Sequence, residues 1–256
     1  TGAFGTGPFG FPSTIRGHVP APSETLTGEQ WVRPVEQNGF EKTGMRAIAK
    51  AAGVSLGNAY YYFSSKDHLV QGFYRRMHEE HLVVARPLLE RERKFDARLR
   101  AVLVTKLETA APYHAFAGHL FRTAADPKSP LNPFSEESRP LRAEATALME
   151  EVVSGSDAKV PKDLRAALPE LLWLYEMAII LFWVHDESRG ATRSLRLVDR
   201  TVDLVSRLVG LASFPLLKPV RRVVLDLIAD LRSTADPSPV PPEATKATPE
   251  PGDSGR

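Results

Sequence analysis

Apolar residues recur every three or four positions through most of residues 27–233, the spacing that places them on one face of an α-helix. No stretch long enough for a β-strand alternates apolar and polar residues as a half-buried strand would. The pattern therefore predicts an all-α fold. The apolar stripes are Met45, Ile48, Ala49 and Ala52; Leu69, Phe73 and Met77; Leu164, Leu168, Leu171 and Leu172; Val198, Val202, Val205, Leu208 and Val209; and Val220, Val223, Val224, Leu227, Ile228 and Leu231.

Serines and prolines predict where several helices begin. Ser65 and Ser194 are suited to cap helices, because a serine oxygen accepts a bond from a first-turn amide. Pro161 and Pro219 lie where a helix tolerates proline, in its first turn. Pro169 falls inside an apolar period, so we expect it to kink or divide that helix.

Composition narrows the class of protein. The chain has no cysteine, which excludes disulfides, thiolate metal sites and cysteine nucleophiles and fits a reducing cytoplasm. The longest apolar run, Leu171–Val184, has 14 residues including Glu176, fewer than the about 20 that span a bilayer. The first residues lack a signal-peptide pattern. We therefore expect a cytoplasmic protein that spans no membrane.

The stretch Gly53-Val54-Ser55-Leu56-Gly57 matches the G-x-S-x-G pattern of a nucleophile elbow, which requires a strand before the serine. Residues 45–52 are strong helix formers instead. We expect Gly53 to adopt the left-handed conformation of a turn and Ser55 to cap the next helix. A serine hydrolase that uses Ser55 with His185 and Asp186 is a remote alternative, and the prediction is that the protein is not an enzyme.

The segments GFEKTGMRAIA (39–49), AGVS (52–55) and YYYFSSKDHL (60–69) closely resemble the DNA-binding domain of TetR/AcrR-type transcriptional regulators. The residues support the resemblance independently, because a helix-turn-helix needs a small residue where its helices cross, here Ala49, and a permissive turn residue, here Gly53. The net charge of +2 is too mild to indicate nucleic acid, but residues 40–76 hold six Lys or Arg against two Asp or Glu.

The second helix of such a motif lies in the DNA major groove. The resemblance implies that Arg46 contacts phosphate or base, that Tyr60 and Tyr61 contact groove and backbone, and that Lys66 clamps a phosphate. Tyr62 and Phe63 fit packing better than recognition. The remaining candidates at the DNA surface are Ser55, Leu56, Gly57 and Asn58, of which Asn58 can pair with adenine.

Two positions depart from the family. Pro34 falls in the middle of the expected first helix, Thr27–Asn38, so Arg33 should leave the helix. Gly44 stands where the family usually has a Thr or Ser that bonds phosphate. Either the first helix is short and held by Trp31 and Val35, or residues upstream of about Val35 come from a wrong reading frame or start. A helical adaptor with impaired DNA binding therefore stays an alternative.

The resemblance further implies a larger helical half that binds a small-molecule effector and forms a homodimer. The helices at 164–187 and 193–213 are the candidate dimer interface. Glu176 interrupts an apolar run, so it must find a partner or face water, and the candidate partners are a cationic effector and an internal Arg or His. The histidine spacings do not suggest a metal site, and no cofactor is expected. Candidate pocket residues are His114, Phe116, His119, Phe121, Arg122, Phe134, Trp173 and Glu176.

The predicted function is a ligand-responsive regulator, most simply a repressor, that binds a near-palindromic operator. The expected organisation is a tail rich in Gly, Pro and Ser (1–26), a helix-turn-helix domain (27–76), a regulatory and dimerisation domain (77–214), an amphipathic helix (215–233) and a Pro-rich tail (234–256). Gly5 to Gly10 formally match a dinucleotide motif but lack the strand and helix that it requires.

Overall fold

The computed structural model describes residues 31–212 together with 214, 216, 218, 219, 221–223, 225 and 226. Both predicted tails, and most apolar positions of the helix expected after Pro219, lie outside these residues. The chain forms two compact units, Thr1–Ser213 and Phe214–Arg256. In the second unit, residues 218, 219, 221–223, 225 and 226 are helical.

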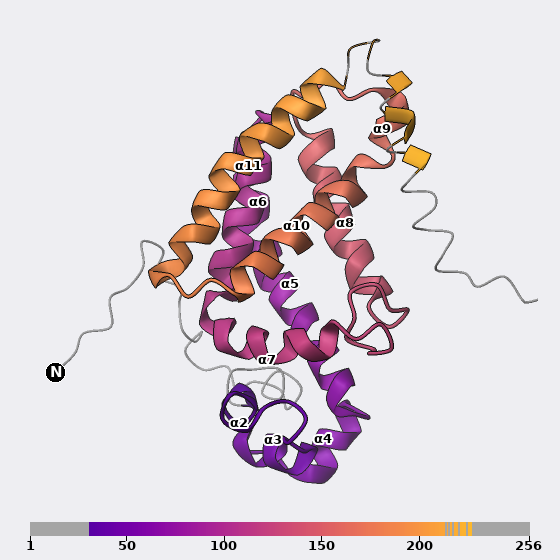
Figure 1. Ribbon diagram of the computed structural model, residues 1–256. Coiled ribbons are helices and arrows are strands. Elements are labelled where there is room, and N and C mark those ends of the chain that lie inside the picture. The colour runs from indigo at the N-terminus through magenta and orange to yellow at the C-terminus, as the bar shows by residue number, and fades with distance from the viewer. Residues whose placement is uncertain are drawn as a thin grey trace, which may run out of the picture. The chain divides into compact units, whose positions relative to one another are not determined.

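The described part of the first unit is helical and contains no β-strand, as the apolar periods predict (Figure 1). Its helices are α2 (Val32–Asn38), α3 (Met45–Ala51), α4 (Leu56–Tyr62), α5 (Lys66–Arg91), α6 (Phe95–Ala110), η2 (Ala111–Tyr113), α7 (His114–Ala124), α8 (Arg139–Ser154), α9 (Lys162–Arg165), α10 (Leu168–Val184), η3 (Arg189–Ala191) and α11 (Thr192–Leu211).

Three short helices, α2, α3 and α4, form a small head, and α5 continues from it into a bundle with α6, α8, α10 and α11 (Figure 1). Helix α7 lies crosswise between the head and the bundle and packs on both α2 and α10. The long helix α5 therefore connects the two parts covalently, and α7 connects them through packing.

The prediction that Arg33 leaves the first helix is wrong. Helix α2 starts at Val32, so Arg33 is helical and Pro34 is the third residue of the helix. The first four amides of a helix have no partner within it, so a proline there removes no hydrogen bond. Trp31 and Val35 are both fully buried, which supports the interpretation of a short first helix held by these two residues.

Ser194 does not cap α11, which corrects a second prediction. The helix starts two residues earlier, and the Ser194 hydroxyl donates to Asp186 Oδ2 at 2.7 Å. The same carboxylate accepts from the Ser194 amide at 2.8 Å and from the Ser188 amide at 3.0 Å. Asp186, just after α10, therefore accepts hydrogen bonds from the first turn of α11.

The predicted break at Pro169 is confirmed, because α9 and α10 are separate helices.

Candidate functional site

Helices α3 and α4 meet in a tight turn. Gly53 has φ +70°, and no atom lies within 4 Å of where a Cβ would be, so the backbone conformation and not lack of space favours glycine. Val54 donates its amide to the carbonyl of Ala49 at 3.0 Å across the turn. Ala49 is buried. The predicted left-handed conformation of Gly53 is therefore confirmed.

Ser55 caps α4, as predicted. Its Oγ accepts a hydrogen bond from the Asn58 amide at 3.1 Å, and the residues before it belong to helix α3 and not to a strand. The suggested hydrolase partner Asp186 is bonded to Ser188 and Ser194. Ser55 thus has the geometry of a cap and lacks that of an elbow nucleophile.

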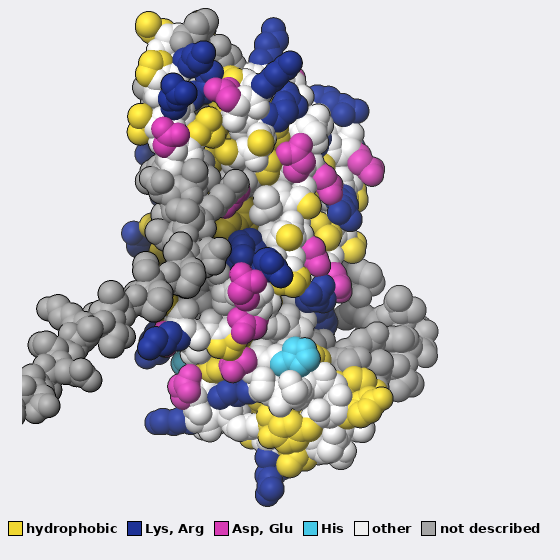
Figure 2. Space-filling model, turned by 90° about the vertical axis from the view of Figure 1, so that its right-hand side faces the viewer, with side chains coloured by type: hydrophobic (Ala, Val, Ile, Leu, Met, Phe, Trp, Pro, Cys, Tyr) yellow, Lys and Arg dark blue, Asp and Glu magenta, His cyan; other side chains and the backbone are white. Residues whose placement is uncertain are grey.

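The outer face of α4 carries side chains that no other part of the head covers. Gly57, Asn58, Tyr60 and Tyr61 are exposed, Tyr61 by 81%, and Leu56 is half-buried. The Tyr61 and Tyr62 rings meet edge to face with centroids 5.0 Å apart. Figure 2 shows hydrophobic side chains beside Lys and Arg at the lower end of this unit, where Figure 1 places the head. Arg46 on α3 is also exposed.

Lys66 connects the start of α5 to the loop before α3. Its Nζ donates to the carbonyl of Phe40 at 2.5 Å and lies 4.0 Å from the centroid of the Phe40 ring. An ammonium group has three donors, so this bond leaves capacity for a phosphate oxygen. The lysine therefore has a structural contact in addition to the role that the resemblance implies.

Thr43 is a head residue that the sequence analysis missed. Its buried hydroxyl lies 2.8 Å from the Gly39 carbonyl and 3.1 Å from the Pro34 carbonyl. One hydroxyl hydrogen serves one of these acceptors at a time. This contact connects α2 and the residue after it to the loop before α3, and no local sequence pattern around Thr43 predicts it.

A cavity of about 570 Å³ lies within the larger part of this unit, bounded by α5, α6, α7, α8, α10 and the loop before α8. That volume is typical of small-molecule sites. Five of the eight candidate pocket residues line it: Phe116, Phe121, Phe134, Trp173 and Glu176. Phe134 is exposed, and its ring meets Trp173 edge to face at 5.4 Å.

The other three candidates, His114, His119 and Arg122, do not line the cavity. The lining positions on α7 are 116, 117, 120, 121 and 124, which form one face of that helix. His114 instead has its Nε2 2.8 Å from the Trp183 carbonyl. Arg122 is exposed. Aromatic and basic residues along one helix could not reveal which face meets the cavity.

The cavity wall is apolar except for a few groups, among which Lys106, Glu176 and His78 interact electrostatically. Lys106 Nζ lies 3.7 Å from Glu176 Oε1, so the buried carboxyl has an internal partner, a lysine where an arginine or histidine was expected. Burial raises the pKa of Glu176, and Lys106 opposes that shift. Burial, with the charges of Lys106, Arg86 and Arg75, lowers the pKa of His78 to about 4.

The head and the cavity share part of their walls. Phe73, Tyr113, Phe116 and Leu131 line the cavity and also belong to the buried core of the head. Trp31, directly before α2, meets Phe116 edge to face at 5.0 Å and Phe73 at 5.8 Å. A displacement of the cavity wall therefore changes the packing around Trp31, at the start of the first helix of the head.

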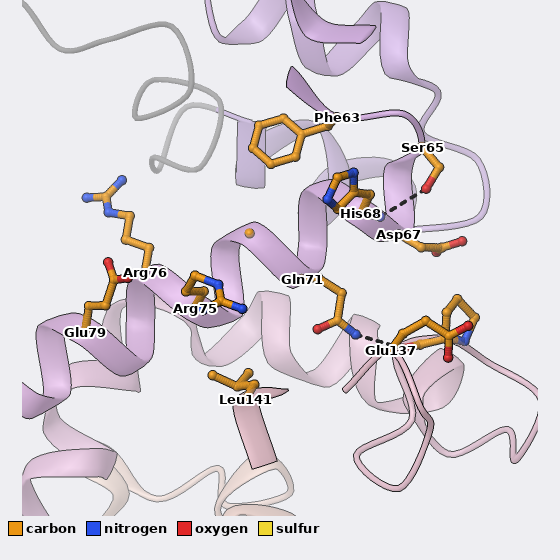
Figure 3. Close-up of a pocket in the computed structure, with 12 residues that line it drawn as sticks. Phe63, Ser65, Asp67, His68, Gln71, Arg75, Arg76, Glu79, Glu137 and Leu141 are labelled. Carbon is orange, nitrogen blue, oxygen red and sulfur yellow. Dashed lines mark hydrogen bonds between the residues drawn. The ribbon is translucent and has the colours of Figure 1, made fainter. Parts of the chain in front are cut away.

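A second pocket, of about 770 Å³, opens between the start of α5, the loop before α8 and α8 itself (Figure 3). Gln71 Nε2 donates to the Pro130 carbonyl at 2.7 Å and to Ser138 Oγ at 3.0 Å across it. Arg75 pairs with Glu144 at 2.9 Å. The Gln71 bonds join α5 to the same loop that carries Leu131 and Phe134 of the cavity wall, and the Arg75–Glu144 pair joins α5 to α8.

Within the described residues no group of three or more His, Cys, Asp or Glu side chains could hold a metal ion. Nor does the described part contain a helix long and apolar enough to cross a bilayer.

Comparison with known proteins places these features in a family. Residues 33–72 match the family described as bacterial regulatory proteins of the tetR family, and residues 98–229 match the tetracyclin repressor-like C-terminal domain. No curated protein matches the chain in sequence.

Solved structures share the fold. A TetR transcriptional regulator from Nitrosomonas europaea is 15% identical, with a TM-score of 0.56 over 71% of this chain and 96% of its own. The fatty acid degradation regulator FadR from Bacillus halodurans is 14% identical, with a TM-score of 0.56 over 70% and 96%. FadR from Bacillus subtilis, solved in complex with stearoyl-CoA, is 14% identical, with a TM-score of 0.55 over 71% and 96%. The chain belongs to the TetR family of bacterial transcriptional regulators, with an N-terminal DNA-binding domain and a C-terminal ligand-binding domain.

Proposed function

We propose that the protein is a homodimeric repressor in the cytoplasm that binds a near-palindromic operator and releases it when a small molecule fills the cavity. The observation that carries this proposal is the shared wall: Phe73, Tyr113, Phe116 and Leu131 belong both to the cavity and to the core of the DNA-binding head. An effector that changes the packing of these side chains therefore changes the packing of the head directly.

The exposed face of α4 supports the DNA contacts. Asn58, Tyr60 and Tyr61 project from it, and Arg46 lies exposed on α3, so base edges and phosphates can be met together. Leu56 and Gly57 fill the first turn, where glycine allows close approach to DNA. Ser55 fixes the start of the helix through the Asn58 amide. Lys66 is the proposed phosphate clamp.

The outer faces of α10 and α11 support the dimer. Large apolar side chains that the described residues leave uncovered lie along them, and in water such a stripe is favourably covered by a second copy. Two heads would then reach successive major grooves on one side of the duplex. The exposed apolar residues are Leu181, Phe182, Leu204, Leu208 and Leu211.

The cavity supports an effector site, with Phe116, Phe121, Phe134, Trp173 and Glu176 as its proposed contacts. A ligand that fills the cavity would displace Leu131 and Phe134 in the loop before α8. Because that loop is hydrogen-bonded to Gln71 near the start of α5, its displacement would also move the helix that carries the head. The change in spacing between two heads would then release the operator.

The test is a titration of the full chain onto labelled DNA from the region upstream of its own gene. We expect one dimer per site, binding that weakens with salt, and release by a ligand that quenches tryptophan fluorescence. If no such fragment binds even at low salt while the chain is folded, the adaptor alternative replaces the repressor. If DNA binds but no cavity ligand releases it, the coupling through the shared wall is wrong.

A further inference from the structure

His78 on α5 has an unmet hydrogen bond at the cavity wall. The residue lines the cavity, is only 2% exposed, and its Nε2 has no hydrogen-bond partner among the described residues. Leaving a buried polar atom without a partner is energetically costly. A cavity that keeps such an atom in an otherwise largely apolar wall is suited to a ligand that supplies the missing partner.

The charged groups of the same wall each have a contact within the protein. Lys106 and Glu176 face each other at 3.7 Å and offset each other's charge. Arg142 donates its Nη1 to the carbonyls of Pro133 and Ser135 in the loop before α8. A charged ligand would have to displace one of these internal contacts or leave its charge without a partner away from water, which is costly.

The imidazole itself is neutral at physiological pH. Burial is the main cause of its low pKa, of about 4, and the cations Lys106, Arg86 and Arg75 lower it further. A neutral imidazole nitrogen bonds a hydroxyl or a carbonyl oxygen, according to its tautomer, without needing a counter-charge. The unmet hydrogen bond at His78 is therefore met by a neutral partner.

The other lining residues indicate the chemical character of the rest of the ligand. The cavity is lined by Tyr74, Met77 and Leu107, and also by Phe116, Trp173 and Met177. Methionine and aromatic side chains favour apolar groups without fixing their exact shape. We infer that the effector is an uncharged, mainly apolar molecule with a hydroxyl or carbonyl oxygen, and that His78 is the residue that recognises this oxygen.

This inference rests on the proposed effector site, and it is tested with probes of equal chain length. The probes are 1-decanol, 1-chlorodecane, decanoate and decylamine, and binding is followed by tryptophan fluorescence because Trp173 and Trp183 line the cavity. In the natural sequence we expect decanol to bind more tightly than the other three. Tighter binding of decanoate or decylamine would mean that Lys106, Arg142 or Glu176 selects the ligand, and the inference would be overturned.

Substitutions then isolate the imidazole. His78→Leu should weaken decanol binding about tenfold, the loss of roughly one neutral hydrogen bond, and leave chlorodecane binding unchanged. His78→Gln, which keeps a hydrogen-bonding group, should restore most of the decanol affinity. His119→Leu is the matched control, since His119 does not line the cavity. Equal decanol affinity in His78→Leu and the natural sequence would overturn the role of His78.

The probe series does not require any variant to fold, because the comparison of decanol with chlorodecane is made on the natural sequence. DNA binding by the same preparations separates this inference from the proposed function. If decanol binds through His78 but the chain binds no operator, the ligand class stands and the repressor fails. If a cavity ligand releases DNA but decanol and chlorodecane bind equally well, the repressor stands and the ligand class fails.

Discussion

The indole of Trp31 meets the ring of Phe116 edge to face, with 5.0 Å between the ring centroids, and thereby joins the first helix of the DNA-binding head to a wall of the cavity. Trp31 is fully buried. Trp31→Ala should therefore lower the free energy of unfolding by about 3 kcal/mol, through the cavity that it leaves. Urea denaturation checks this, and an unchanged midpoint would show that the head does not depend on this contact.

Two neighbouring aromatic residues separate DNA contact from packing. Tyr61 is 81% exposed on α4, whereas Phe63 is 8% exposed in the core of the head. Tyr61→Ala should weaken operator binding and leave the midpoint of thermal unfolding unchanged. Phe63→Ala should cost about 3 kcal/mol of stability, as large-to-small core substitutions do. If Tyr61→Ala lowered stability and Phe63→Ala weakened only operator binding, Tyr61 would be the packing residue and Phe63 the DNA contact.

Lys66 is tested through the salt dependence of DNA binding. Lys66→Ala removes one proposed phosphate contact per subunit, and hence two per dimer, so the plot of log affinity against log salt should become shallower by about 1.8. Some loss of stability should accompany it, since Lys66 also bonds the Phe40 carbonyl. Lys162→Ala, far along the chain on α9, is the control. A slope equal to that of the natural sequence would remove Lys66 from the phosphate contacts.

The predictions that succeeded from sequence rest on local chemistry. Ser55 and Ser65 accept from amides three residues onward, and Gly53 needs a positive φ for its own backbone. Each of these interactions is completed within a few residues. Helix type and helix caps were therefore readable without knowledge of the tertiary structure.

The predictions that failed, and the residues that were missed, depend on distant partners. Pro34 was misjudged because its cost depends on where the helix begins. Ser194 was misjudged because its partner, Asp186, lies eight residues earlier at the end of another helix. Thr43 and His78 were missed because their surroundings are set by packing between segments, and no period in the sequence encodes those contacts.

The buried histidines predict a loss of stability in acid. The pKa of His78 is lowered to about 4 and that of His81 to about 3, in both cases mainly by burial. Both lie below the ordinary value, so the unfolded chain binds more protons as the pH falls from about 6.5 to 4, and stability falls with it.

His78→Leu should remove part of this pH dependence. Between pH 7 and pH 5 the natural sequence should lose about 2 kcal/mol more stability than the variant. Urea denaturation at both pH values measures the difference, with His119→Leu as the control. Equal losses in the natural sequence and in His78→Leu would show that the imidazole titrates normally in the folded protein.

The proposed dimer surface predicts a contrast between two exposed apolar residues. Leu208 on α11 is 56% exposed and Val83 on α5 is 74% exposed. Leu208→Lys should shift the protein toward a monomer and weaken operator binding, because a buried charge opposes the interface. Val83→Lys should alter neither property. Light scattering during gel filtration distinguishes the outcomes, and a dimer that survives Leu208→Lys would place the interface elsewhere.

The bond between Asp186 and Ser194 has a mechanical consequence. Burial alone would raise the pKa of Asp186, but hydrogen bonds from Ser188 and Ser194 outweigh it and hold the pKa well below the ordinary value. The carboxylate therefore stays charged, and it faces the positive end of the α11 macrodipole. Helices α10 and α11 thus form a stiff corner, and we expect it to act as the stationary frame of the dimer, against which α5 and α7 pivot when the cavity fills.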